Sequence, residues 1–177
     1  LCLINEMKIE ENIGAATTYI NCGTVYKAFS KAEESLPLFC KAQSIYDKEL
    51  ESSDARFGAL YNNMALALVD LKRFNEAYEL YGKAISVMKK SKNGLLEVAI
   101  TYLNIASAKE LELGIEKSAE IIDEYLKKAM KILDEYENRD GYYAFVCEKC
   151  ASVFDYYGYF VYNLELKERV KNIYERS

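Results

Sequence analysis

A short phrase, Tyr-x-Asn followed two residues later by Gly or Ala, occurs three times in this chain, at residues 19–23, 61–65 and 102–106. The three asparagines are 42 and 41 residues apart. Self-similarity at a fixed period of this size is typical of chains built from stacked helical units, each of which buries its apolar face against its neighbours. The phrase therefore predicts an array of similar units.

The amino-acid composition favours helices and argues against catalysis. One proline and eight glycines among 177 residues leave few interruptions of helical structure. Histidine is absent, so the commonest general base and metal ligand is missing. No segment resembles a phosphate-binding loop or a nucleophile motif. We therefore predict a protein that is not an enzyme, with no catalytic residue, no metal site and no cofactor.

Charge, hydropathy and cysteine content limit the partners and the compartment. The formal net charge of −5 and the pI near 5.0 argue against nucleic acid, whose phosphates require a basic surface. No apolar run approaches the roughly 20 residues that span a bilayer, so no membrane partner is predicted. The five cysteines are an odd number without a disulfide framework, which favours a reduced, cytoplasmic protein. Cys147 and Cys150 form a lone C-x-x-C without two further zinc ligands, and we predict that they are structural.

Each unit is predicted to contain two antiparallel helices. In the first unit, Tyr19, Gly23 and Tyr26 lie at helical spacing on one face, and Gly23 is the small residue where a neighbouring helix comes close. Small residues recur at equivalent positions: Gly23, Ala65 and Ala106 in the first helices, and Ala42, Ala84 and Ala129 in the second helices. The third unit has about four more residues between its two small positions, beside residues 113–117.

The boundaries of the units follow from this register. We predict four repeats, at residues 13–53, 54–93, 94–138 and 139–177. Residues 1–12, which are apolar at positions 1, 3, 4, 7 and 9, fit the end of a preceding, truncated helix. Pro37 is expected to mark the start of the second helix of the first repeat, because a proline deeper in would kink that helix.

The spacing of aromatic and small residues resembles the tetratricopeptide repeat (TPR) family. The matching positions are Tyr19, Gly23, Tyr26 and Ala42 in the first repeat, and Tyr61, Ala65, Leu68 and Ala84 in the second. The commonest repeat of that family has about 34 residues, and the longer period of this chain is similar to that of kinesin light chains and their bacterial relatives. The proline that often ends the family's repeat is missing. The resemblance implies an all-α helical-repeat solenoid, a right-handed superhelix of antiparallel helix pairs, in a single domain over 13–177.

The asparagines of the phrase are predicted to face the inner surface of the array. At about 100° per residue, Asn21 lies roughly 200° from Tyr19, opposite the face that packs on the second helix. Asn21, Asn63 and Asn104 would then form a ladder along the concave surface. An asparagine amide can bond the N–H and the C=O of a bound peptide together. The alternative is that the asparagines brace adjacent first helices by hydrogen bonds across the stack.

Further residues share the predicted concave face with this ladder. They are Thr17, Ile20, Thr24 and Lys27 in the first repeat, Ala59, Asn62, Leu66 and Asp70 in the second, and Ile100, Leu103, Ser107 and Glu110 in the third. Leu66, Ile100 and Leu103 are apolar where a purely structural helix could be polar. Their presence indicates a groove for a ligand.

Three functions are compatible with such an array. The first is a protein–protein interaction module that holds an extended peptide or a helix of a partner in its concave groove. The second is a scaffold, oligomerisation or regulatory arm that uses the convex face or a tyrosine-rich C-terminal end, comprising Tyr142, Tyr143, Tyr156, Tyr157, Tyr159 and Tyr162. These tyrosines either cap the last core face or dock a partner, such as a second copy of the chain. The third is the sensor part of a larger peptide-responsive regulator, whose effector domain would lie elsewhere.

Overall fold

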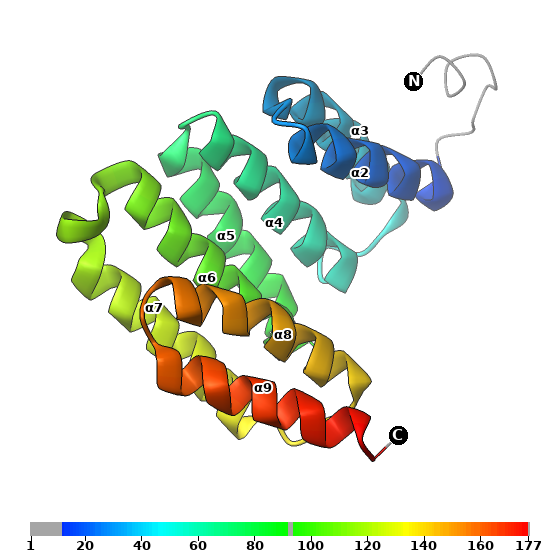
Figure 1. Ribbon diagram of the computed structural model, residues 1–177. Helices are drawn as coiled ribbons and strands as arrows, with labels where there is room; N and C mark the ends of the chain where they lie inside the picture. Colours follow the sequence, from blue (N-terminus) through cyan, green and yellow to red (C-terminus); the bar gives the residue numbers. More distant parts are fainter. Residues whose placement is uncertain (1–11, 92–93, 177) are drawn as a thin grey trace. The chain divides into compact units, whose positions relative to one another are not determined.

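A computed structural model of the chain describes residues 12–91 and 94–176 (Figure 1). Those residues form eight α-helices, labelled α2 to α9, and contain no strand. The predicted helix end at residues 1–12 lies, apart from Asn12, outside the described residues. The all-α, helical-repeat fold class is therefore confirmed for the described chain.

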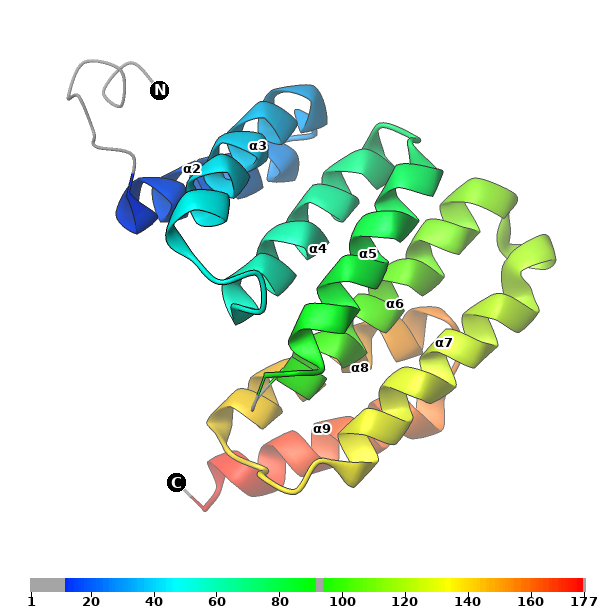
Figure 2. The same ribbon diagram turned by 180° about the vertical axis from the view of Figure 1, so that it is seen from behind.

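The first compact unit ends at Lys90 and contains two antiparallel helix pairs. Its helices are α2 (Ile13–Ala28), α3 (Ala32–Glu49), α4 (Ala55–Asp70) and α5 (Phe74–Met88). Helix α2 packs on α3, α4 packs on α5, and α3 also packs on α4, while α2 and α4 are in contact (Figure 2). This arrangement places the first helices of the two repeats next to each other.

The second compact unit begins at Ser91 and also contains two helix pairs. Its helices are α6 (Gly94–Leu113), α7 (Ile115–Glu135), α8 (Gly141–Tyr156) and α9 (Phe160–Tyr174). Helix α6 packs on α7 and α8 packs on α9, and α6 also packs on α8. Each predicted repeat range holds one helix pair. The single solenoid domain over 13–177 remains a prediction.

Acidic or amide side chains cap the first helices of three repeats. Asn12 accepts a hydrogen bond from the backbone N–H of Ala15 at 3.0 Å, and Asp54 accepts one from Arg56 at 2.9 Å. Asp140 accepts from the N–H groups of Tyr142 and Tyr143. Such caps satisfy backbone donors that a helix start leaves without a partner.

The turns between the two helices of a pair also repeat along the chain. Ser30, Lys72 and Gly158 have positive φ angles of 59°, 59° and 79°. In each case the next residue donates its backbone N–H to the carbonyl five residues earlier, at 2.8 to 3.0 Å. This is a common way of closing a helix with one left-handed residue. Ser30 and Lys72 adopt the conformation although a side chain disfavours it.

Small residues let the helices of each pair approach closely. The predicted small positions are all buried: Gly23, Ala42, Ala65, Ala84, Ala106 and Ala129. A Cβ atom on Gly23 would lie only 2.6 Å from the ring of Phe39 on α3. The absence of a side chain at Gly23 is therefore required by the packing of α2 on α3.

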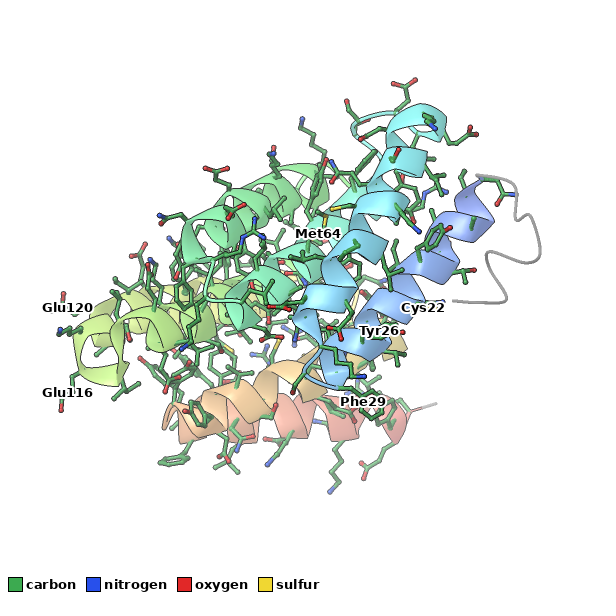
Figure 3. All side chains as sticks on the ribbon, turned by 90° about the horizontal axis from the view of Figure 1, so that it is seen from above. Cys22, Tyr26, Phe29, Met64, Glu116 and Glu120 are labelled. Atoms are coloured by element: carbon green, nitrogen blue, oxygen red, sulfur yellow. The ribbon has the colours of Figure 1, made fainter. Side chains whose placement is uncertain are left out.

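The position of Pro37 differs from the sequence-based expectation, and the structure shows where the extra residues of the third repeat lie. Helix α3 begins at Ala32, so Pro37 is inside the helix, beyond its first turn, and does not mark its start. The additional length of the third repeat is in its helices, since α6 and α7 have 20 and 21 residues, compared with 16 and 15 for α4 and α5. Glu116 and Glu120 on the first turns of α7 are exposed at this longer end (Figure 3).

Candidate functional site

In the first unit, the predicted site residues lie on α2 and α4. We call the surface formed by Thr17, Asn21, Thr24, Asn63, Leu66 and Asp70 the asparagine face. Thr17 and Thr24 are exposed, and their hydroxyl groups donate to the backbone carbonyls of Ile13 and Ile20 at 3.0 and 2.9 Å. These hydroxyl protons are used within α2, so a ligand would meet the threonine oxygens as acceptors.

An ion pair joins the two helices of the asparagine face. Lys27 Nζ on α2 lies 3.2 Å from Asp70 Oδ2 on α4, and the two side chains are 26% and 39% exposed. Both residues were predicted to be on the concave face from helical geometry alone. The pair is a direct contact between the first helices of adjacent repeats.

Two asparagines of the repeated phrase, Asn21 and Asn63, do not brace the helices by hydrogen bonds. Asn21 is exposed and Asn63 is half-buried, and neither side chain makes a hydrogen bond to another residue in the described part of the chain. Adjacent helices are instead connected by Lys27 and Asp70. Among the other predicted residues of these helices, Ile20, Asn62 and Leu66 are half-buried and Ala59 is exposed. The amides of Asn21 and Asn63 are thus available to a ligand.

In the second unit, the predicted residues of α6 are mostly used in internal packing. Leu103 is only 3% exposed and belongs to the hydrophobic core, and Ile100 packs against that core, so Leu103 cannot line an open groove. Asn104 is half-buried. Ser107 Oγ lies 3.5 Å from the hydroxyl of Tyr157 on α8. Helical geometry places a residue on a face, but it does not reveal whether a later repeat covers that face.

The C-terminal tyrosines attach the last helix pair to the preceding one. Glu110 on α6 accepts hydrogen bonds from Tyr156 and Tyr157, at 2.9 and 2.8 Å. Tyr142 bonds Glu97, and Tyr159 bonds Asp123 on α7. These hydroxyl groups are satisfied within the unit, which favours the cap interpretation. Burial, together with the hydrogen bond to Asp123, raises the pKa of Tyr159 to about 12.

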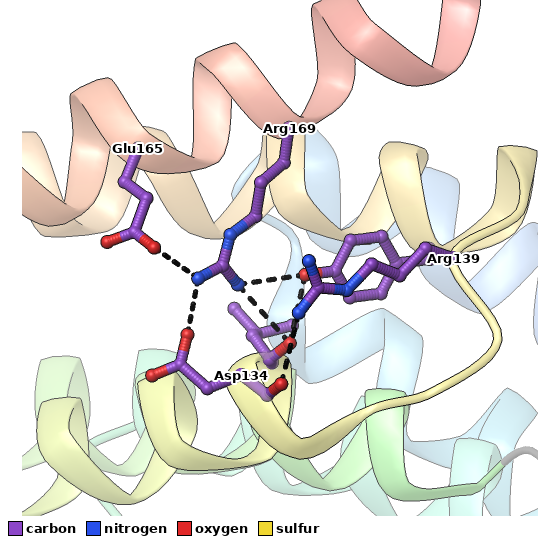
Figure 4. A network of polar contacts seen from close by, with 6 residues as sticks. Asp134, Arg139, Glu165 and Arg169 are labelled. Atoms are coloured by element: carbon purple, nitrogen blue, oxygen red, sulfur yellow. Dashed lines mark hydrogen bonds and ion pairs between the residues drawn. The ribbon is translucent and has the colours of Figure 1, made fainter. Parts of the chain in front are cut away.

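A polar network around Arg169 connects three helices of the second unit (Figure 4). The guanidinium on α9 donates to Asp134 Oδ1 at 2.5 Å and also to Glu165. Its other terminal nitrogen lies 3.0 Å from the hydroxyl of Tyr143, which in turn donates to the carbonyl of Leu133 at 2.9 Å. Burial raises the pKa of Tyr143 to about 12. No periodic signal in the sequence marks this network.

The Cys147 and Cys150 pair is buried on α8. Both thiols are free, and burial raises the pKa of each, so neither is a reactive thiolate near neutral pH. Within residues 12–91 and 94–176, no three metal-ligating side chains gather in one place. Over the same residues, none of the helices combines the length and apolar character needed to cross a membrane.

The paired helices, the buried small residues and the repeated turns define a TPR-like helical-repeat protein. No family model matches the sequence, and no curated protein matches it. Solved structures do match. One is a protein of Podosopora anserina described as a kinesin light chain with nearly identical TPR-like repeats, with 16% identity, a TM-score of 0.56, and coverage of 99% of this chain and 82% of that chain.

Two further structures agree with the first. A variant of the Podosopora anserina protein matches with 16% identity and a TM-score of 0.56, covering 99% of this chain and 84% of that one. BtubC (BKLC) from P. vanneervenii matches with 15% identity and a TM-score of 0.59, covering 91% of this chain and 63% of that one. At such identities the likeness is one of fold. The chain has the TPR-like repeat fold of kinesin light chain structures, as the sequence predicted.

Proposed function

We propose that this chain is a non-enzymatic protein–protein interaction module, whose asparagine face holds an extended segment of a partner protein. The observation that carries the proposal is the pair of amides on Asn21 and Asn63. They lie on neighbouring helices and have no hydrogen-bond partner among the described residues. Each amide offers both donors and an acceptor, which is what a peptide backbone requires.

The spacing of the two helices suits an extended backbone. Packed helices have axes roughly 8–10 Å apart, and an extended chain rises about 3.3 Å per residue. Asn21 and Asn63 would therefore bond backbone groups about three residues apart. Recognition of this kind depends little on the side chains of the partner, so adjoining half-buried residues, Ile20 and Leu66, would supply the apolar contacts that select among sequences.

The proposal can be tested without knowing the natural partner. Peptides are selected from a displayed random library against the full chain, and their affinities are measured for the wild type and for the Asn21→Ala, Asn63→Ala double variant. Two lost hydrogen bonds, at about 0.5–1.5 kcal/mol each, predict a loss of affinity of roughly 5- to 150-fold. Asn75→Ala, at an exposed position of α5, is the matched control and should leave the affinity unchanged. Equal affinities for all three proteins would refute the proposal.

A second candidate function is self-association through α9. Phe160, Val161 and Leu164 on this helix are 62%, 75% and 66% exposed, and Tyr156 nearby in sequence is 70% exposed. An isologous contact between two copies would bury these apolar side chains. Sedimentation of the wild type at increasing concentration should then show dimers, and Val161→Glu with Leu164→Glu should abolish them. A wild type that stays monomeric at high concentration would exclude this candidate.

A further inference from the structure

An open groove in the first unit is lined by residues of α3, α4 and α5. It has a volume of about 730 Å³. Met64 and Leu68 of α4 form its floor and are almost fully buried. Leu36 on α3 and Leu80 on α5 form apolar walls on either side, and both are half-buried. The groove is thus an apolar trough that is bordered by two parallel helices.

The rim of this groove carries unbalanced negative charge at one end. Arg73 and Glu76 neutralise each other through two hydrogen bonds of 2.7 and 2.6 Å. Glu33 on α3 and Glu79 on α5 are exposed, and neither forms an ion pair with another described residue. Lys83 also lines the groove, one helical turn beyond Glu79. Glu33 and Glu79, neither of them in an ion pair within the described chain, therefore lie on opposite walls of the groove and outnumber the unpaired Lys83.

Pro37, inside α3, removes one backbone hydrogen-bond donor from the wall of the groove. A proline has no backbone N–H, so the carbonyl of Glu33 cannot receive the usual bond from the residue four positions later. Both Glu33 and Pro37 line the groove. Among the described residues that line the groove, Arg73 is paired with Glu76, whereas Glu33 is in no ion pair.

We infer that this groove is a second binding site, and that its ligand is a short amphipathic helix of a partner protein. Its apolar side chains would pack on Leu36, Leu68 and Leu80, and a lysine or arginine would lie between Glu33 and Glu79. An apolar groove between helices is a common receptor for the apolar face of another helix. The negative charges of Glu33 and Glu79 favour a partner helix that carries a basic residue at this position. This site is separate from the asparagine face, because it is bordered by the second helices of the two repeats.

Cys40 provides a reporter for the test. It is an exposed free thiol that lines the groove, whereas Cys22 is on α2. Two synthetic helical peptides with the same leucine stripe are added to the full chain, one with lysine and one with glutamate beside the stripe. Alkylation of Cys40 and Cys22 is followed by mass spectrometry. The lysine peptide should slow alkylation of Cys40 at least fivefold without affecting Cys22, and the glutamate peptide should have little effect.

Charge reversal of the rim makes the test specific. The Glu33→Lys, Glu79→Lys double variant should lose protection by the lysine peptide and gain protection by the glutamate peptide. Glu34→Lys, beside the groove but not lining it, should behave as the wild type. Circular dichroism checks that the variants are folded. Unchanged Cys40 alkylation with the lysine peptide, or equal protection by both peptides in every variant, would overturn the inference.

Discussion

Lys27 and Asp70 form an ion pair, with Nζ 3.2 Å from Oδ2, between the first helices of two adjacent repeats. The contact joins α2 to α4, while the amides of Asn21 and Asn63 make no hydrogen bond to another described residue. The contact between the helices and the proposed ligand contact thus involve different residues of one surface.

The Lys27–Asp70 pair should contribute modestly to stability. Both side chains are partly exposed, so we expect a coupling energy of about 0.2–1 kcal/mol. A double-mutant cycle with Lys27→Ala and Asp70→Ala, measured by chemical denaturation, gives this value directly. The coupling should shrink in 1 M salt, where the Debye length falls to about 3 Å. A coupling of zero at low salt would show that α2 and α4 are held together by packing alone.

Glycine at the left-handed turn residues should stabilise the protein. Ser30 and Lys72 have a φ of 59°, which side chains disfavour, whereas the equivalent Gly158 has no such cost. Ser30→Gly and Lys72→Gly should each raise the unfolding free energy by about 0.5–1 kcal/mol. Ser44→Gly, in the middle of α3, is the control and should lower it. Lower stability of both turn variants would contradict the turn geometry.

The second unit should lose stability at alkaline pH. Burial raises the folded-state pKa of Tyr143 and of Tyr159 to about 12, above the value of about 10 in an unfolded chain. The native state therefore binds these protons more tightly, and this stability is complete below about pH 10 and is lost as the pH rises through about 12. The raised pKa values of the thiols Cys147 and Cys150 act in the same direction.

The contribution of one hydroxyl to the alkaline effect, that of Tyr159, can be measured separately. Denaturant midpoints are measured at about pH 8 and 11.5 for the wild type and for Tyr159→Phe, which retains the ring but loses the hydroxyl. The decrease in midpoint should be smaller in the variant. Identical decreases in both proteins would mean that Tyr159 does not contribute.

Arg169 should be among the most sensitive positions of the second unit. Its side chain is 14% exposed and bonds residues of α7, α8 and α9. Arg169→Met would leave several of these groups without partners, and we expect a loss of roughly 2–3 kcal/mol. Arg169→Lys should recover only part of it, because an ammonium cannot reproduce the guanidinium fork. Arg176→Met, at an exposed position, should change stability by less than about 0.5 kcal/mol.

The repeat architecture was predictable because its determinants are local and periodic. Gly23 and Ala42 are small residues in register with their equivalents in later repeats, and each position is buried as expected. Lys27 and Asp70 were both assigned to the predicted concave face, but the ion pair between them was not foreseen. Helical periodicity fixes the direction of a side chain, whereas pairing depends on how adjacent repeats are offset.

Features that depend on tertiary packing were not predictable. Leu103 was assigned to the groove because it is apolar on the predicted inner face, but it is buried in the core of the second unit. Pro37 was interpreted as a helix start, although it lies inside α3 and borders a groove. The Arg169 network joins residues that are far apart in sequence, and no repeat position encodes it.

The most direct test of the proposed function is a crystal structure of the full chain with a peptide selected as described above. We predict that the amides of Asn21 and Asn63 bond backbone N–H and C=O groups of the peptide, at about 2.7–3.2 Å. A peptide bound elsewhere, with both asparagines unbonded, would contradict the central claim.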